Sequence, residues 1–348
     1  MDTGVSVTRE WDRLSEVVVG RAPDFTFPAD LSQLETLSFL PAALLDRGPS
    51  LAGRRWSEAA PEWFARCQEQ LDALAAFLRG RGITVHRPRP LSPAERRIHE
   101  EFAPVSLQHF VRDPMIVIGD TVIEASLRMP HRAKERYGLR PLFRELVARG
   151  ARHVVVPPGC PAPLPEIATA EGPFLEGGDV MLFGEDVLVG VGEGRFATDE
   201  AGVDWLRELL GDRHRVHPVP LHPRVLHLDD GLAAPREGLA IVAREQFTEG
   251  IPRLLADWDL IEVSLDDALE LLAANVLVLE PGVVVLDSRL PRLAEALTAH
   301  GVTVHTLDYD AVTPFGGGFR CSHHPVRRER RDSPVGQNVR GTAGILPP

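Results

Sequence analysis

Four short segments hold most of the side chains that could do chemistry. They are Arg112-Asp113-Pro114, Glu176-Gly177-Gly178-Asp179, His227-Leu228-Asp229 and the run from Gly316 to Cys321. If they meet, one pocket holds a thiol, an imidazole and several carboxylates. This set suits covalent catalysis by the thiol, with the imidazole transferring protons.

Cys321 is the candidate nucleophile. A thiol attacks as the thiolate, and because its ordinary pKa is about 8.5, a histidinium or a cationic substrate nearby must lower that value. Three glycines at residues 316–318 precede Cys321 and would let the backbone approach a ligand closely. The alternative is a small buried hydrophobic role, which we expect instead for Cys67 and Cys160.

His227 is the candidate acid and base. Asp229 lies two residues on, so in a strand both side chains point to one face. The alternative is a histidine that merely satisfies its hydrogen bonds at a strand end. The spacing of His214, His217 and His222 fits neither a helical metal pair nor a zinc finger, so we expect strand or loop roles for them and no metal.

The acidic residues of these segments need a reason to gather beside a thiol. Asp113, Glu176, Asp179 and Asp229 would repel one another unless a cation lay among them. A guanidinium meets this requirement because its planar fork pairs with carboxylates. The alternative for each acid is a turn-capping or surface role.

The elements that would position these segments recur along the chain. Alternating β-branched runs with Gly, Asp or Pro turns predict hairpins at 114–126, 179–191 and 275–287, and a weaker one at 231–244. A helix and a further strand follow each clear hairpin, with helices at 141–149, 200–210 and 291–300 and strands at 153–156, 216–221 and 302–307. A strand at 17–20, a helix at 61–79 and a strand at 83–87 repeat part of this plan.

The strand, strand, helix, strand unit thus occurs about five times, which favours a radially repeated α/β architecture. Equivalent turns of such a repeat converge on a common axis, where the four reactive segments would meet. We expect one closed catalytic domain over residues 1–328 and a mobile tail over 329–348. The proline-rich stretch 157–171 is predicted to be a surface excursion between repeats.

Composition and charge narrow the partners. The 348 residues carry a net charge of −12, which argues against nucleic-acid or anionic-membrane surfaces and favours small-molecule substrates. Three cysteines without a CxxC pair indicate a reducing compartment. We find neither a signal-peptide pattern nor a membrane-spanning run, so we expect a cytoplasmic protein, and we leave a homodimer open.

The motifs RDP, EGGD, HLD and GGGFRC, in this order, resemble those of the guanidino-group-modifying enzymes, the pentein superfamily. This resemblance implies a five-bladed, pseudo-symmetric α/β propeller of ββαβ modules. The segments EWDRLSEVVVG and GGGFRCSHHPVRR look like the arginine-dependent amidinotransferases, including those of natural-product biosynthesis. The stretch EGGDVMLFGEDVLVGVGEGRFAT is more similar to the hydrolases arginine deiminase and dimethylargininase.

The resemblance also implies roles. Cys321 corresponds to the nucleophile, His227 to the acid and base, and Glu176 to the carboxylate that orients His227. Asp113 and Asp229 would hold the guanidinium. Asp179 and Arg195 would also bind substrate, Arg195 through the substrate carboxylate. The expected reaction moves the amidino group of L-arginine to an amine acceptor through an amidino-cysteine, without a cofactor. The alternatives are a hydrolase with the same residues and a non-catalytic guanidine-binding scaffold. Loops such as 24–57 would cover the site and decide whether water enters.

Overall fold

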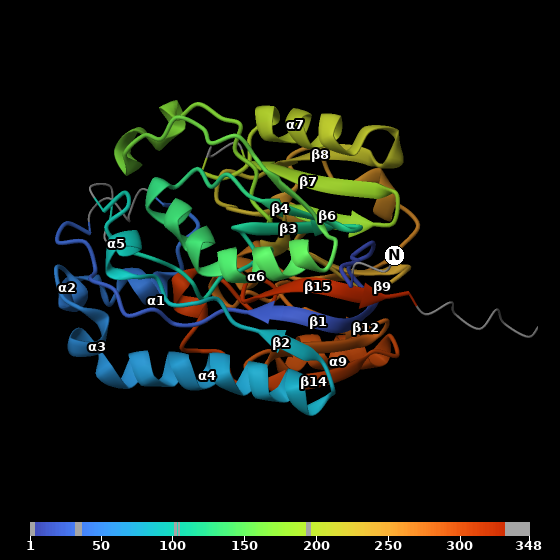
Figure 1. The fold of residues 1–348 in the computed structure, drawn as a ribbon. Coiled ribbons are helices and arrows are strands. Elements are labelled where there is room, and N and C mark those ends of the chain that lie inside the picture. Colours follow the sequence, from blue (N-terminus) through green and yellow to red (C-terminus); the bar gives the residue numbers. More distant parts are fainter. Residues whose placement is uncertain (1–3, 32–36, 101–102, 104, 193–195, 331–348) are drawn as a thin grey trace, which may run out of the picture.

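Five three-stranded sheets form the framework of the chain in a computed structural model (Figure 1). The structure describes residues 4–330 except 32–36, 101–102, 104 and 193–195. In every sheet the middle strand is antiparallel to one neighbour and parallel to the other. The fold is therefore the predicted α/β propeller of five related modules.

Four sheets follow the chain in order. They consist of β3 (Met115–Ile118), β4 (Thr121–Glu124) and β5 (Arg152–Val155); β6 (Val180–Phe183), β7 (Asp186–Gly192) and β8 (Arg215–Leu221); β9 (Leu232–Arg236), β10 (Leu239–Val242) and β11 (Asp259–Glu262); and β12 (Leu277–Glu280), β13 (Val283–Asp287) and β14 (Thr303–Leu307).

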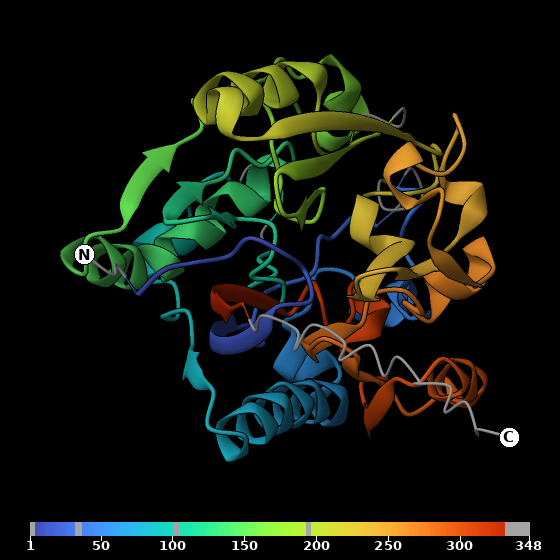
Figure 2. The ribbon, with the colours of Figure 1, turned by 90° about the vertical axis from the view of Figure 1, so that its right-hand side faces the viewer.

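The fifth sheet joins the two ends of the described chain. Its middle strand β1 (Arg13–Val19) is parallel to β2 (Thr84–His86) and antiparallel to β15 (His323–Glu329), with Val19 opposite His323. Because the last strand completes the first module, the ring of sheets closes, and Figure 2 shows the modules around a common centre with the long helices outside. Glu329 still belongs to β15, and the predicted tail lies outside the described residues from 331 onward.

Helices connect the second and third strands in four modules. These are α4 (Pro61–Gly80), α6 (Arg136–Ala148), α7 (Glu200–Leu210) and α9 (Pro291–Ala299). The weaker fourth hairpin has only short 3-10 turns at Arg244–Gln246 and Arg253–Leu255 before β11. The remaining α-helices of the described residues are short: α1 (Ala42–Leu45), α2 (Gly48–Leu51), α3 (Trp56–Ala59), α5 (Pro93–Arg96) and α8 (Leu265–Glu270). No helix of the described residues is long and apolar enough to cross a membrane.

The hairpins form where the sequence predicts them because their turn residues favour a reversal of the chain and their strand residues are apolar. Gly119 and Gly184 turn with φ of +57° and +79°, a conformation that glycine adopts without a steric penalty. Strands such as β3 and β10 are buried along their whole length, which explains their continuous apolar sequences.

The stretch 157–171 lies between β5 and β6 and is mostly exposed, as predicted for a surface excursion, but it also carries buried side chains. Leu164 begins a 3-10 helix, and the side chains of Ala162, Leu164 and Ile167 are buried. Prolines remove the regular apolar period from this stretch, yet Ala162 and Leu164 still have apolar partners to pack against.

Candidate active site

Each of the five sheets contributes a polar or reactive residue just before its first strand. Asp113 precedes β3, Glu176 precedes β6, His227 and Asp229 precede β9, Asn275 precedes β12, and Cys321 precedes β15. None of these six residues is more than 3% exposed. Segments from the whole chain therefore meet at one buried place.

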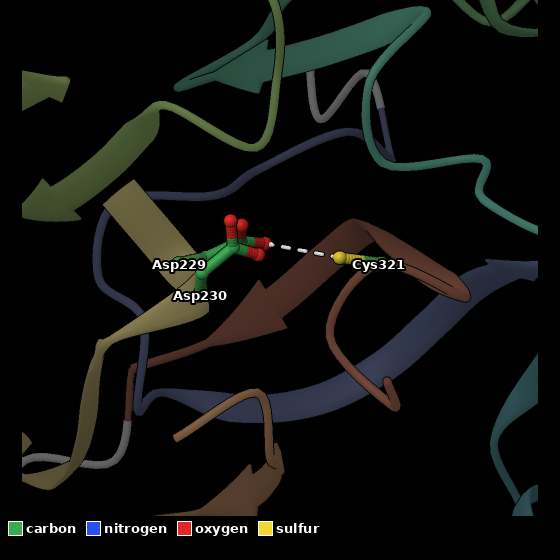
Figure 3. Close-up of side chains that lie close together, drawn as sticks. All are labelled: Asp229, Asp230 and Cys321. Atoms are coloured by element: carbon green, nitrogen blue, oxygen red, sulfur yellow. Dashed lines mark hydrogen bonds between the residues drawn. The ribbon is translucent and has the colours of Figure 1, made fainter. Parts of the chain in front are cut away.

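Carboxylates and an amide surround the Cys321 thiol. Asn275 Nδ2 donates to Cys321 Sγ at 3.1 Å, and Sγ lies 3.7 Å from Asp229 Oδ2. Figure 3 shows the carboxyl groups of Asp229 and Asp230 side by side, facing the sulfur. Burial and the negative charges of Asp229, Asp113 and Asp230 raise the pKa of Cys321 well above its ordinary value, although the Asn275 hydrogen bond opposes them. The thiol keeps its proton until a positive charge arrives.

The His227 ring lies between two carboxylates. Its Nε2 is 2.9 Å from Glu176 Oε2, and its Nδ1 is 3.8 Å from Asp113 Oδ1. Burial by itself would lower the pKa of His227, but Asp113, Asp179 and Glu176 raise it well above the ordinary value. The ring is therefore an imidazolium with a proton to give. Glu176 is itself fixed, because the backbone N–H of Arg128 donates to its Oε1 at 2.9 Å.

Asp113 and Asp229 share an unusual pattern of contacts. Arg132 Nη1 lies 2.9 Å from Asp113 Oδ2, and Arg320 Nη1 donates to Asp229 Oδ2 at 2.8 Å. The other oxygens, Asp113 Oδ1 and Asp229 Oδ1, are buried and have no hydrogen-bond donor among the described residues. Unpaired buried carboxylate oxygens are costly, so this pair favours a ligand that brings N–H groups and positive charge.

Asp179 lies in a supporting position. Its Oδ1 accepts from the N–H of Leu228 at 3.0 Å and its Oδ2 from the N–H of Thr198 at 3.4 Å. It does not line the cavity described below. These two contacts let Asp179 hold the loop that carries His227. Arg195 lies outside the described residues.

The glycines of the motifs serve close packing between chain segments. A Cβ on Gly178 would lie 2.6 Å from His227 Cγ, and one on Gly177 would lie 2.0 Å from the Arg112 carbonyl oxygen. In the run before Cys321, a Cβ on Gly317 would meet the ring of Phe110 at 2.5 Å. The sequence predicted that these glycines let the backbone approach a ligand closely. Gly317 instead packs closely against the Phe110 side chain, whereas Gly316 lines the cavity.

Sequence reasoning missed Asn275, Arg132 and Arg320. Asn275 occupies the same place before β12 that the reactive residues occupy before the other first strands, so the repeat itself could have pointed to it. Arg320 stands inside the GGGFRC motif, but its partners Asp229 and Glu10 come from distant parts of the chain. No local pattern marks Arg132, whose role depends on Asp113 and on Glu135.

The other cysteines and histidines lie elsewhere. Cys67 is buried in α4 as expected, whereas Cys160 is exposed, so the prediction of a buried role for Cys160 is wrong. His217 belongs to β8, and His214 and His222 flank that strand, which confirms their strand or loop roles.

A cavity opens beside the thiol, with about 820 Å³ of empty space including its mouth. Cys321, His227 and Asp113 form its polar side, and Arg132 lies next to them. Much of the opposite wall comes from segment 24–57, through residues such as Phe27, Phe39 and Leu44. Described residues of the segment that the sequence suggested as a cover therefore form part of the cavity wall.

No protein-family model matches the chain, but individual proteins do. A Streptomyces griseus chain assigned as inosamine-phosphate amidinotransferase 2 is 30% identical, spanning 93% of this chain and 97% of the relative. The L-arginine:L-lysine amidinotransferase of Pseudomonas savastanoi pv. phaseolicola is 23% identical over 92% of this chain and 93% of its own. The solved inosamine-phosphate amidinotransferase of Streptomyces griseus is 25% identical, with a TM-score of 0.74 and coverage of 94% and 97% of the two chains. From this similarity over nearly its whole length, the chain belongs to the amidinotransferase family of the pentein superfamily.

Proposed function

We propose that this protein transfers the amidino group of L-arginine to an amine acceptor through a covalent intermediate on Cys321. The observation that carries the proposal is the pair Asp113 and Asp229. Each carboxylate has one oxygen held by a buried arginine and one oxygen unpaired, and the pair lies around the thiol and imidazole. A guanidinium would supply the missing donors and the missing charge.

Binding of the guanidinium activates the nucleophile. The charges of Asp229 and Asp113 are among the causes that raise the pKa of Cys321, and a cation between them cancels this effect. The thiol then releases its proton to solvent as the cation enters, because His227 already carries a proton. The thiolate adds to the guanidinium carbon, the C–N bond to the side chain of arginine breaks, and the His227 imidazolium protonates the departing nitrogen. Ornithine leaves, and the amidino group stays on Cys321.

The acceptor reverses these proton movements. His227, now neutral, takes a proton from the amine while the amine nitrogen attacks the amidino carbon. The C–S bond breaks, and the products are a new guanidine and the Cys321 thiolate. Glu176 holds the ring in place through both steps with its 2.9 Å contact to Nε2.

The covering segment favours transfer over hydrolysis. Cys321 is 3% exposed, and the apolar residues of segment 24–57 keep bulk water from the amidino-cysteine. A guanidino hydrolase with the same residues, the alternative from the sequence, would instead need water at this carbon.

The test is to incubate the protein with arginine, with and without an amine, and to follow ornithine, citrulline and the intact protein mass. We expect an amidino adduct on Cys321, and ornithine release that continues only when an amine is present. Citrulline and ammonia without an acceptor would instead identify a hydrolase. The Cys321→Ala variant should lose both the adduct and turnover, whereas a Cys160→Ala control should keep them.

A further inference from the structure

Arg320, the residue before Cys321, is buried and links two acids. Its Nη1 donates to Asp229 Oδ2 at 2.8 Å, while its Nε and Nη2 donate to Glu10 Oε2 at 3.2 Å and 3.1 Å. We propose that Glu10 is a positioning residue of the reaction, which balances the charge of Arg320 so that Asp229 remains able to attract the substrate guanidinium. This inference rests on the proposed function and assigns a role to the segment Glu10-Trp11-Asp12, which that function leaves unused.

The Glu10 carboxylate is held in place by its own module and by a neighbouring one. The N–H of Glu10 donates to the carbonyl oxygen of Leu182 in β6 at 3.0 Å, and the N–H of Leu182 donates back to Glu10 Oε1 at 3.1 Å. The other oxygen, Oε2, also lies 3.7 Å from Nη2 of Arg112, the residue before Asp113. Glu10 therefore lies between the arginines that directly precede a guanidinium-binding acid and the nucleophile.

Glu10 carries a negative charge in this buried network. Burial by itself would raise the pKa of Glu10, but the positive charges of Arg320, Arg112 and Arg328 lower it below the ordinary value. Without that charge, Asp229 would be the remaining acid that Arg320 contacts in the described structure. The substrate guanidinium would then compete with Arg320 for Asp229, and it would enter a site with one more positive charge.

Glu10→Gln removes the charge and keeps an oxygen for the N–H of Leu182. We expect KM for arginine to rise by about tenfold, with a smaller change in kcat, because the lost charge acts on guanidinium binding. Loss of a negative charge also favours the thiolate, so alkylation of Cys321 by iodoacetamide should move to lower pH by about one unit. KM is measured from ornithine release, and alkylation in a Cys160→Ser background because Cys160 is exposed.

Arg112→Gln makes the opposite change in charge beside the same carboxylate. Burial and the charge of Arg320 lower the pKa of Arg112 to about 9, so its guanidinium is still protonated at neutral pH. Its removal should lower KM for arginine and move Cys321 alkylation to higher pH. The double variant Glu10→Gln with Arg112→Gln should return both values toward those of the parent protein. General damage to the site would not produce shifts of opposite sign that cancel.

Two further variants separate charge from folding. Glu10→Asp keeps the charge on a shorter side chain, so its alkylation profile should match that of the parent protein. Glu16→Gln is the matched control, because Glu16 is also a buried acid of the first module and is paired with Arg149 at 2.6 Å, away from the cavity. Urea unfolding should show a loss of stability in Glu16→Gln, with KM and Cys321 alkylation unchanged.

The outcomes distinguish this inference from the proposed function. Parent-like KM and alkylation in a folded Glu10→Gln variant would overturn the inference and leave the transferase intact. Shifts of the same sign in Glu10→Gln and Arg112→Gln would overturn it as well. If Glu10→Gln does not fold, Arg112→Gln decides, and alkylation that fails to move to higher pH contradicts the inference. Absence of the amidino adduct on Cys321 in the parent protein would instead overturn the proposed function, whereas the alkylation profiles need no substrate.

Discussion

Asn275 holds the Cys321 segment from two sides. Its Oδ1 accepts from the backbone N–H of Cys321 at 3.0 Å and of Gly318 at 3.2 Å, while its Nδ2 donates to the sulfur at 3.1 Å. The donor faces a sulfur whose pKa is raised by the negative charges of Asp229, Asp113 and Asp230. Asn275 is thus a positioning residue that also favours the thiolate.

Asn275→Asp should raise the pKa of Cys321 further. The variant keeps an acceptor for the two backbone N–H groups but replaces the donor beside the sulfur with a carboxylate oxygen. We expect kcat/KM for arginine at neutral pH to fall by about 10²–10³. We also expect the pH dependence of Cys321 alkylation by iodoacetamide to move to higher pH, measured in a Cys160→Ser background because Cys160 is exposed.

Gln70→Glu is the matched control for this change. Gln70 is also a buried amide, and it bonds to Asp310 and to Ala311, away from the cavity. It should lose stability without any shift in thiol titration. An identical alkylation profile in Asn275→Asp and the parent protein would refute a direct effect on the sulfur.

The sequence could predict the reactive residues but not the residues that hold them in position. Cys321 stands out as one of three cysteines, and His227 stands out among 13 histidines because Asp229 lies two residues on. Arg132 and Arg320 belong to a chain with 38 basic residues, and their function arises only when folding buries them against Asp113 and Asp229. Burial and partners of this kind are properties of the tertiary structure, which no local spacing encodes.

At the level of elements, the candidate catalytic residues occupy the same position in each module, just before its first strand. The residues just before the first strand point to the centre in every sheet, and glycines beside them allow the segments to touch. Gly178 is an example, since its missing side chain leaves room for the His227 ring. The hairpins were predictable because turn residues and apolar strands are local signals. After the weaker fourth hairpin the sequence predicted no helix, and the structure has only short 3-10 turns there before β11.

Gly178→Ala should impair catalysis more than folding. A methyl group 2.6 Å from His227 Cγ must displace the ring from its contact with Glu176. We expect kcat to fall by about 10²-fold or more, since small misplacement of a catalytic group has this effect. The measurement is steady-state ornithine release, with urea unfolding to report stability.

Gly80→Ala is the matched control for Gly178→Ala. Gly80 ends α4, and a Cβ there would meet no atom within 4 Å. This variant should keep full activity and gain slightly in stability because alanine favours the helix. Full activity in Gly178→Ala would show that the His227 position tolerates the added methyl.

For the molecule as a whole, closure of the ring places acids and histidines in a common buried centre. Burial raises the pKa of both Asp179 and Asp230 to about 7, and Asp229 adds to the effect on Asp230. Burial disfavours the charged form of histidine as well, but there it shifts the pKa in the opposite direction. It lowers the pKa of His109 and His131 to about 3 and those of His323 and His324 well below the ordinary value. These two groups give opposite slopes of stability against pH.

The sign of each slope depends on whether the folded or the unfolded chain binds more protons. Between pH values of about 4 and 6.5 the unfolded chain protonates the four histidines that the folded chain keeps neutral, so their contribution to stability grows with pH. Over about 4 to 7 the folded chain holds protons on Asp179 and Asp230 that the unfolded chain has released, so stability falls with pH. His227, with its raised pKa, loses stabilising free energy only as the pH rises above about 6.5. We expect maximal stability near pH 6.5, measured as the free energy of unfolding in urea.

Asp230→Asn isolates one of these contributions. Asparagine keeps an oxygen for the N–H of His227, which donates to Asp230 Oδ2 at 3.0 Å, but it cannot bind the proton. The free energy of unfolding of the variant relative to the parent protein should therefore rise by up to about 1.4 kcal/mol per pH unit between about pH 4 and 7, and then stay constant. Asp72→Asn, at a side chain that is 70% exposed, should give no such rise. Parallel curves for Asp230→Asn and the parent protein would mean that Asp230 is ionised throughout, and that the centre of the ring holds one more negative charge to be balanced by the substrate.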